Sequence, residues 1–308
     1  ITQLVYIIKR YSYQIEIVEE QVMQLRVENL QMEFKQKTAL NQVSFTIESG
    51  GLIGLIGPNG AGKSTLMKIV ATLLKPTQGD ILLDGKSIIT NPQIIQRQLG
   101  YMPQQIPYVP QLSAVEYLRY LAALKGLPKE ASDQQIQQLL SLLHLHDVQR
   151  QTLATFSGGM RQRVGLAAAL LGDPKIIIVD EPSTGLDPIE RISIRNLLSE
   201  LAQDRIVILS THIVSDIEAV ASNLLLLRNG KLVFQGTADK LITTAQNRVW
   251  EYVIPLGQHP QDEDNVSELR QSQDGIHVRV VAEKQPTPEA IIVAPTLEDA
   301  SLVVLEGK

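Results

Sequence analysis

The stretch that most constrains this chain is a glycine-rich loop with the spacing G-x-x-x-x-G-K-[ST]. This phosphate loop consists of Gly57, Pro58, Asn59, Gly60, Ala61, Gly62, Lys63, Ser64 and Thr65. The apolar run at 52–56 predicts a short buried strand before it, and apolar residues at helical spacing predict an amphipathic helix after it. The helix residues are Leu66, Ile69, Val70 and Leu73. A strand before and a helix after are the context in which this spacing binds phosphate.

The phosphate loop is expected to bind an anion through its backbone. Glycines let successive N–H groups point into one concavity at a helix N-terminus, where the helix dipole also favours negative charge. Lys63 adds a positive charge for the β- and γ-phosphates of a nucleotide, and the Ser64 hydroxyl is expected to ligate Mg²⁺. The alternative is a glycine-rich turn that binds nothing, but the flanking strand and helix favour a nucleotide site.

Composition narrows the class of protein further. The chain has 308 residues, 44% hydrophobic and 20% charged, which is enough to bury a large core in one or two domains. A formal net charge of −5 without a long basic run argues against a nucleic-acid partner. The absence of cysteine excludes disulfides, thiol nucleophiles and cysteine-ligated metals. No apolar run reaches the roughly 18 residues of a membrane-spanning helix, so we expect another chain to cross any membrane that this one serves.

Changes in composition and hydrophobic patterning along the chain predict three segments. Residues 1–22 are interpreted as an appended extension rather than a signal peptide, because basic residues follow their apolar run. Residues 23–244 form the main domain, which begins with two antiparallel strands within 25–47. Three helical patterns within about 106–170 indicate a helical subdomain inserted into an α/β core. Residues 245–308 form a small α+β domain, with strands at 249–254 and 276–281 and a helix at 297–305.

An apolar strand at 176–179 ends in two adjacent carboxylates, Asp180 and Glu181. A strand that is buried on both faces delivers the residues at its carboxyl end to the crevice where open α/β sheets bind ligands. Asp180 is expected to hold Mg²⁺, directly or through water. Glu181 is expected to orient and deprotonate the water that attacks the γ-phosphate. The alternative is a surface acidic pair, which the nearby phosphate loop disfavours.

A second anion site is predicted at residues 157–159. Ser157 has the residue type of a helix N-cap, and Gly158 and Gly159 leave the helix N-terminus open to an anion. Each interaction at such a helix end contributes about 0.3–1 kcal/mol, and about 2 kcal/mol when partly buried. The chain is therefore expected to carry two phosphate sites.

The chain resembles the nucleotide-binding subunit of ABC transporters over about residues 25–244. The resemblance rests on six motifs that follow one another in the family's order. They are Walker A (57–65), a Q-loop that ends at Gln104, the signature (156–160), Walker B (176–181), a D-loop that ends at Asp187, and the switch histidine His212. The resemblance implies an α/β fold: a P-loop NTPase core with a mixed, mainly parallel sheet, an antiparallel β subdomain and an inserted α-helical subdomain. It also implies ATP and Mg²⁺ as cofactors.

The resemblance explains the second phosphate site and assigns further roles. In this family two such domains pair head to tail, so that residues 157–159 of one chain close over the ATP of the other. Gln104, in preference to Gln105, would reach Mg²⁺ and the attacking water, and His212 would contact the γ-phosphate. Asp187 would act across the dimer interface. Phe34 would stack on adenine, although a core phenylalanine is nearly as well supported there.

The signature departs from the family's common L-S-G-G-Q at two positions, because Phe156 and Met160 replace Leu and Gln. The Ser-Gly-Gly centre is intact, so we expect activity to survive. The variant signature and the stretch at 295–300 are similar to those of bacterial exporters whose permease is a separate chain. The resemblance therefore implies an ATPase subunit on the cytoplasmic face of the cell membrane that drives export through such a permease.

Several questions stay open from the sequence. The partner ATPase is a second copy of this chain or a paralogue, and the cargo is not specified. Export over import rests on the resemblance alone. One rival function is a soluble ABC-type ATPase in translation or DNA repair, and another is a regulatory module that binds nucleotide without hydrolysis. The intact Lys63, Asp180, Glu181 and His212 argue against the second rival.

Overall fold

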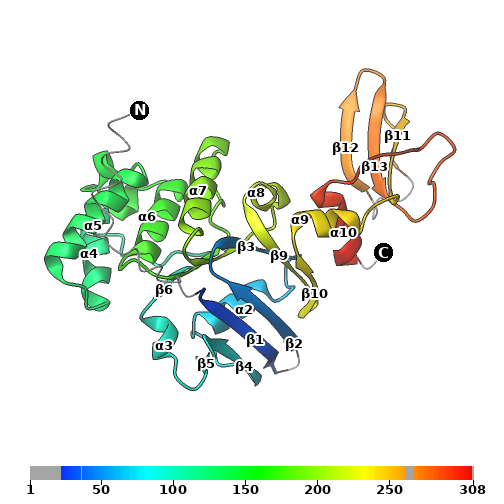
Figure 1. The fold of residues 1–308 in the computed structure, drawn as a ribbon. Coiled ribbons are helices and arrows are strands. Elements are labelled where there is room, and N and C mark those ends of the chain that lie inside the picture. Colours follow the sequence, from blue (N-terminus) through cyan, green and yellow to red (C-terminus); the bar gives the residue numbers. More distant parts are fainter. Residues whose placement is uncertain (1–21, 36, 261–265, 307–308) are drawn as a thin grey trace, which may run out of the picture.

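The computed structural model describes residues 22–35, 37–260 and 266–306. The predicted extension at 1–22 therefore lies, except for Val22, outside the described residues. The described chain has the predicted α/β fold. Two sheets and an inserted group of helices form a body, and a third sheet projects from it on the side opposite helices α4 and α5 (Figure 1).

A six-stranded sheet lies at the centre of the described chain. Its strands in spatial order are β10 (Lys231–Gly236), β9 (Ala221–Arg228), β3 (Gly51–Ile56), β8 (Ile206–Ser210), β7 (Ile176–Asp180) and β6 (Leu99–Met102). Neighbouring strands run parallel except β10, which pairs antiparallel with β9. Strands β7 and β8 are buried along their whole length, which explains their continuous apolar sequences.

The two faces of the central sheet pack against different layers. One face, which includes Ile176 and Ile178, packs with helix α2 (Lys63–Val70) and the antiparallel sheet. That sheet contains, in order, β2 (Lys37–Glu48), β1 (Gln24–Phe34), β4 (Gln78–Leu83) and β5 (Lys86–Ser87). The opposite face, which includes Ile177 and Val179, packs against helices. These are α6 (Gly158–Leu170), α7 (Pro188–Leu201) and α8 (Val214–Glu218).

Helix α2 is shorter than the sequence predicts. It ends at Val70, and Thr72 then has a positive φ of 59°. The Leu73 amide donates to the Lys68 carbonyl and closes the helix end. The predicted burial of Leu73 on the apolar face is wrong, because the left-handed residue before it turns the chain outward and leaves Leu73 60% exposed.

The predicted helical subdomain contains α4 (Ala114–Leu124), α5 (Lys129–Leu142) and α6. The short helix α3 (Gln93–Gln96) precedes it. A capping box starts α4: Ser113 Oγ accepts the Glu116 N–H, and the Glu116 carboxylate accepts the Ser113 N–H at 2.8 Å. The apolar stripes of α4 and α5 are buried against α6, so the three helices share one core.

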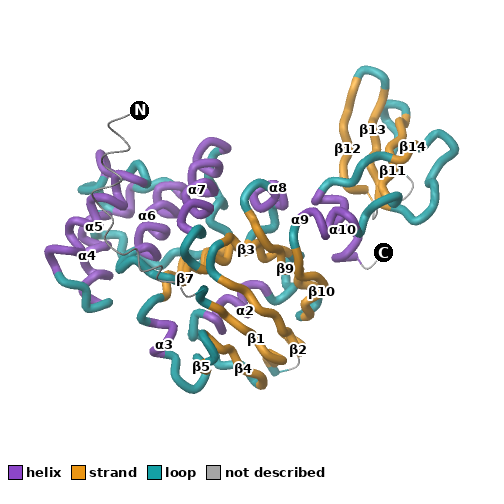
Figure 2. Tube along the Cα trace, in the orientation of Figure 1, coloured by secondary structure: helices purple, strands orange, loops and turns teal. Residues whose placement is uncertain are grey.

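The C-terminal residues form the third sheet and a final helix (Figure 2). The strand order of this third sheet is β12 (Val266–Ser272), β13 (Gly275–Val281), β11 (Val249–Ile254) and β14 (Ile291–Ile292). The sequence did not predict β12 and β14. Helix α10 (Leu297–Glu306) packs against α9 (Ala238–Thr243) and strand β9 of the body. Its residues Leu297, Ala300 and Val303 belong to the same apolar cluster as Leu224. The domain boundary near 245 stays a prediction.

Within the described ranges, no helix combines the length and the apolar character needed to cross a membrane.

Candidate active site

The phosphate loop connects β3 to α2, and its shape depends on glycine. Gly60 and Gly62 have φ values of 80° and 106°, in the left-handed region that other residues rarely adopt. A Cβ atom on Gly62 would lie only 2.6 Å from the Ala39 carbonyl oxygen. On its other side the loop meets the turn between β9 and β10, where the Gly230 N–H donates to the Ala61 carbonyl at 3.0 Å. The loop therefore lies between strand β2, which carries Ala39, and the β9–β10 turn, which carries Gly230.

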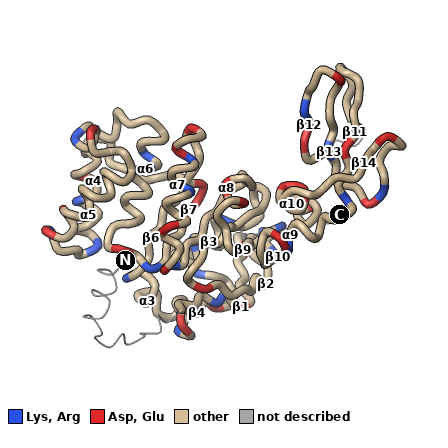
Figure 3. The backbone as a smooth tube through the Cα atoms, turned by 45° about the horizontal axis from the view of Figure 1, so that its top comes forward, with Lys and Arg blue, Asp and Glu red and all other residues tan. Residues whose placement is uncertain are grey.

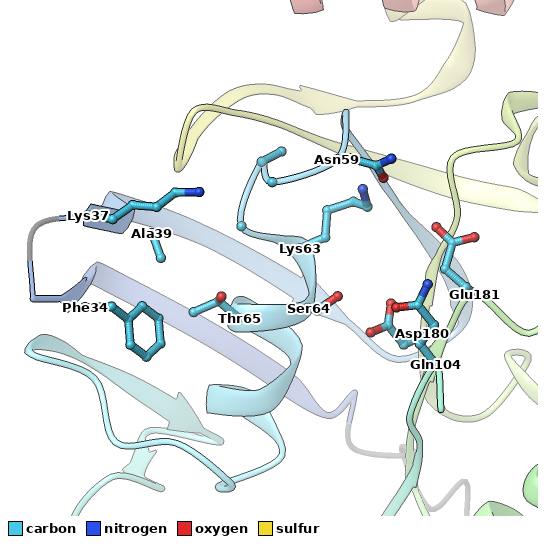
Figure 4. A pocket seen from close by; sticks show the side chains of 13 residues that line it. Phe34, Lys37, Ala39, Asn59, Lys63, Ser64, Thr65, Gln104, Asp180 and Glu181 are labelled. Carbon is cyan, nitrogen blue, oxygen red and sulfur yellow. The ribbon is translucent and has the colours of Figure 1, made fainter. Parts of the chain in front are cut away.

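The loop opens onto a cavity of about 340 Å³, called here the loop cavity (Figure 4). It is lined by Phe34, Lys37, Ala39, Asn59, Gly60, Ala61, Gly62, Lys63, Ser64, Thr65, Gln104, Asp180 and Glu181. Most of the predicted cofactor and catalytic residues thus meet at one place. Gln104 comes from the segment after β6, and Asp180 and Glu181 come from the carboxyl end of β7. Gln104 lines the cavity and Gln105 does not.

Lys63 is buried beside the loop that it completes. Its Nζ donates to the carbonyl oxygens of Gly57, at 2.6 Å, and Pro58, at 3.2 Å. These two residues do not line the cavity but hold the lysine. Burial lowers the pKa of Lys63, while the nearby carboxylates of Glu181 and Asp180 act to raise it. A desolvated cation of this kind gains stability when an anion such as a phosphate approaches it.

Asp180 has the environment of a metal ligand. Its side chain is buried, and Oδ1 has no hydrogen-bond partner among the described residues. The Ser64 hydroxyl and the Gln104 side chain face the same part of the cavity (Figure 4). Carboxylate, hydroxyl and amide oxygens are the donors that Mg²⁺ prefers, so the predicted set of Ser64, Gln104 and Asp180 fits this ion.

Glu181 and His212 lie side by side at the carboxyl ends of β7 and β8. His212 Nδ1 is 2.8 Å from Glu181 Oε2. Glu181 is buried and has a positive φ of 52°, a conformation that is costly for a residue with a side chain. The segment that carries His212 is fixed by Thr211 Oγ1, which accepts the Ile213 N–H at 3.0 Å. The pair can orient a water molecule and take its proton.

Besides His212, the predicted signature and D-loop residues lie outside the loop cavity. Ser157 caps helix α6 by accepting the Met160 N–H at 3.1 Å, and Ser157 and Gly158 are exposed. Phe156, one of the two unusual signature residues, is buried in the core. Asp187 is exposed and caps α7 by accepting the Glu190 N–H at 2.8 Å. These residues are therefore not brought to the phosphate loop of their own chain.

The structure adds residues that the sequence predictions did not include. Lys37 and Ala39 on β2 line the loop cavity together with Phe34 at the end of β1. Phe34 is 44% exposed, so it is not a core phenylalanine. The available signal was proximity, because both residues lie within five positions of Phe34 across the predicted β-hairpin.

Comparison with known proteins decides the family. A family model described as "ABC transporter" matches residues 40–184. The chain is 34% identical over 226 residues to the "Uncharacterized ABC transporter ATP-binding protein YxlF" of Bacillus subtilis, which covers 73% of this chain and 75% of that protein. This chain belongs to the ABC transporter ATP-binding proteins. The predicted family is thereby confirmed.

Two further matches extend the likeness. The "Uncharacterized ABC transporter ATP-binding protein YhcH" of Bacillus subtilis is 32% identical over 273 residues, 87% of this chain and 88% of that protein. The solved "Dimeric structure of a post-hydrolysis state of the ATP-binding cassette MJ0796 bound to ADP and Pi" is 26% identical. It covers 69% of this chain and 98% of its own, with a TM-score of 0.65. The chain thus has the fold of an ABC ATPase and belongs to a family that binds and hydrolyses ATP.

Proposed function

We propose that this chain is an ATPase subunit that pairs head to tail with a second ATPase and powers export through a separate membrane-embedded permease. The observation that carries the proposal is the assembly of the loop cavity. Lys63, Asp180 and Glu181 face one space, and His212 contacts Glu181. This set provides a phosphate site, a metal ligand and a base, which are the parts that ATP hydrolysis requires.

In the proposed reaction, a water oxygen bonds to the γ-phosphorus while the bond between that phosphorus and the β–γ bridging oxygen breaks. Glu181 accepts the proton of the water, and His212 holds the Glu181 carboxylate in place. Lys63 balances the charge of the β- and γ-phosphates. Mg²⁺, held by Ser64, Gln104 and Asp180, would neutralise phosphate charge. The products are ADP and inorganic phosphate.

The position of the second anion site supports the head-to-tail dimer. The N-terminus of α6 is exposed outside the loop cavity, so its Ser157 and Gly158 are free to meet a nucleotide on another chain. Asp187, exposed at the start of α7, is available to the same interface. The similar MJ0796 cassette is dimeric and bound to ADP and Pi. The partner is a second copy of this chain or a paralogous ATPase.

A permease partner is supported by the surface of the helical subdomain. Tyr120 and Leu124 lie one turn apart on α4 and are exposed, as are Tyr108 and Val109 in the segment before it. Exposed apolar side chains on this helix and on the segment before it are available to a partner surface. We place this surface against a permease on the cytoplasmic face of the membrane. The direction proposed, export, is supported by the signature and by residues 295–300, which resemble those of exporters.

Nucleic acid is not part of the proposed function. Basic and acidic residues are interspersed along the described chain (Figure 3).

Mild-detergent purification of the tagged chain from native membranes distinguishes the transport function from its rival, a soluble ATPase in translation or DNA repair. A stoichiometric multi-spanning partner is the expected result. Recovery only from the soluble fraction, with ribosomes or DNA-repair proteins, would contradict the transport assignment and leave the ATPase chemistry intact.

The dimer is tested with Glu181→Gln. This variant keeps the side-chain shape but removes the base, so we expect ATP to bind and hydrolysis to slow by about 10²- to 10⁴-fold. ATP should then trap a dimer in sedimentation velocity, and the same variant without nucleotide is the control. Monomer alone at saturating ATP would contradict head-to-tail pairing.

A further inference from the structure

We propose that Lys37 is a further nucleotide-binding residue, which contacts the α-phosphate of the bound nucleotide. The inference rests on the proposed function, because it takes the loop cavity to be the ATP site. Lys37 is the first residue of β2 and lines the cavity next to Phe34 and Ala39. It lies outside the six motifs that identify the family.

The lysine amine lies over the phosphate loop. A Cβ atom built on Gly60 would be 4.0 Å from Lys37 Nζ, and no other heavy atom beyond the residues next to Gly60 comes as close. Figure 4 shows the Lys37 side chain extended from the β-hairpin toward the loop, with Lys63 on the side nearer Glu181. The two lysines therefore place positive charge at two ends of the same backbone concavity.

The charge on Lys37 is available to a ligand. Within the described ranges, Lys37 forms no salt bridge and no side-chain hydrogen bond. Its side chain is exposed, so the ammonium group is hydrated and does not serve the core. A lysine in this position provides a charge-assisted hydrogen bond to a phosphate oxygen without the loss of another partner.

The order of groups in the cavity indicates which phosphate Lys37 meets. Asp180 and Glu181 define the end where the γ-phosphate is attacked. Phe34 lies at the far end, where the base would stack (Figure 4). Lys37 is on the Phe34 side of the loop and Lys63 on the Glu181 side. A nucleotide laid along the loop therefore presents its α-phosphate, which ATP and ADP share, to Lys37.

The bland alternative is a solvated lysine that contributes nothing to binding, as many surface charges do. Lys35 provides a matched control. It lies two residues away in the same hairpin, is also exposed, and does not line the cavity. A general effect of hairpin charge on ATP affinity would appear in both lysines, whereas a direct contact would appear only in Lys37.

The test compares Lys37→Met with Lys35→Met and wild type, with ATP and ADP affinities measured by fluorescence titration. We expect Lys37→Met to lower the affinities for ATP and for ADP by the same factor, about fivefold. This is the size of the contribution of one exposed charge contact. Lys37→Arg should retain wild-type affinity. The difference in affinity between wild type and Lys37→Met should shrink at high salt, because salt screens the contact. Lys35→Met should leave both affinities unchanged.

Three outcomes would overturn the inference in distinguishable ways. Equal affinities for Lys37→Met and Lys35→Met would show that Lys37 makes no contact. Loss of ATP affinity alone, with ADP unaffected, would overturn the α-phosphate assignment. A wild-type chain that binds neither nucleotide would overturn the proposed function, and this inference with it.

Discussion

Glu181 Oε2 and His212 Nδ1 lie 2.8 Å apart, although 31 positions separate the two residues in the chain. The contact exists because β7 and β8 are parallel neighbours, so their carboxyl ends meet at one edge of the sheet. The Glu181 N–H also donates to the Ser210 carbonyl at 3.0 Å, which ties the two strand ends together. The proposed base is thus positioned by the next strand of the sheet.

Replacing His212 tests this pair. We expect His212→Ala to lower kcat for ATP hydrolysis by about 10- to 100-fold, because Glu181 loses the group that orients it. Affinity for ATP should change much less, since Lys63 and the loop are untouched. His146→Ala is a matched control, because His146 is 59% exposed and His212 is 60% exposed. Equal kcat values for the two variants would contradict the role of His212.

Lys63 is predicted to dominate nucleotide affinity. Lys63→Ala removes a buried cation from the phosphate site, and we expect ATP binding to weaken roughly 10- to 100-fold, as for loss of a charged hydrogen bond. Isothermal titration calorimetry measures the change. Lys68→Ala, on the exposed side of the same helix, should bind ATP as wild type does. Unchanged ATP affinity in Lys63→Ala would argue against the phosphate site.

Asp299 is predicted to hold α10 to the third sheet. It is fully buried and accepts hydrogen bonds from Arg279 at 2.7 Å and Ser267 at 2.6 Å. Asp299→Ala removes the carboxylate partner of Arg279, which keeps its hydrogen bond to the Ala294 carbonyl, and should destabilise this region by about 3 kcal/mol. Faster hydrogen exchange in β12 and β13 would report it. Glu298→Ala, at the exposed neighbouring position, is the control, and equal exchange in the two variants would contradict the prediction.

The same contact predicts a dependence on pH. Burial by itself raises the pKa of Asp299, but the hydrogen bonds from Arg279, Ser267 and Thr296 outweigh it and lower the pKa below its usual range. A lowered pKa in the folded state stabilises the fold above the unfolded value of about 4. This contribution is lost as pH falls through the folded pKa. Acid unfolding followed by circular dichroism should show a smaller stability loss below pH about 4 in Asp299→Asn.

His277 should titrate above an ordinary histidine. Hydrogen bonds with Glu251 and Asp274, both at 3.2 Å, raise the pKa of His277. A raised pKa stabilises the fold fully below the unfolded value of about 6.5, and this effect is lost as pH rises through the folded value. NMR titration of the His277 ring measures the pKa directly. Glu251→Gln should lower it, and an unchanged midpoint would show that the hydrogen bond has no such effect.

Several elements could be predicted from sequence because their signals are local. The strand, phosphate loop and helix at 51–70 follow from the spacing of glycines and apolar residues over about twenty positions. Strands β7 and β8 follow from apolar runs that only a doubly buried strand requires. The capping box of α4 needs just four residues, and the structure contains it. The prediction for Leu73 failed because spacing does not record where a left-handed residue ends a helix.

The composition of the loop cavity was less accessible. Lys37 and Ala39 belong to it because the β1–β2 hairpin packs over α2, a contact between segments with no shared motif. Strand β12 is mostly exposed and polar, so it lacks the alternation that would have predicted it. The packing of α10 against β9 joins residues about 75 positions apart, such as Arg228 and the Leu305 carbonyl at 3.2 Å.

The groups that the proposed chemistry uses can be recognised in the sequence alone: a phosphate loop, two carboxylates at a strand end, and a histidine later in the chain. These motifs can be recognised in the sequence because each consists of a few residues that are close together in the chain. Which side chains share the loop cavity, and which, like Ser157, lie outside it, is set by the tertiary fold. That outcome depends on how sheets and helices pack, and packing brings together residues whose separation along the chain carries no periodic signal.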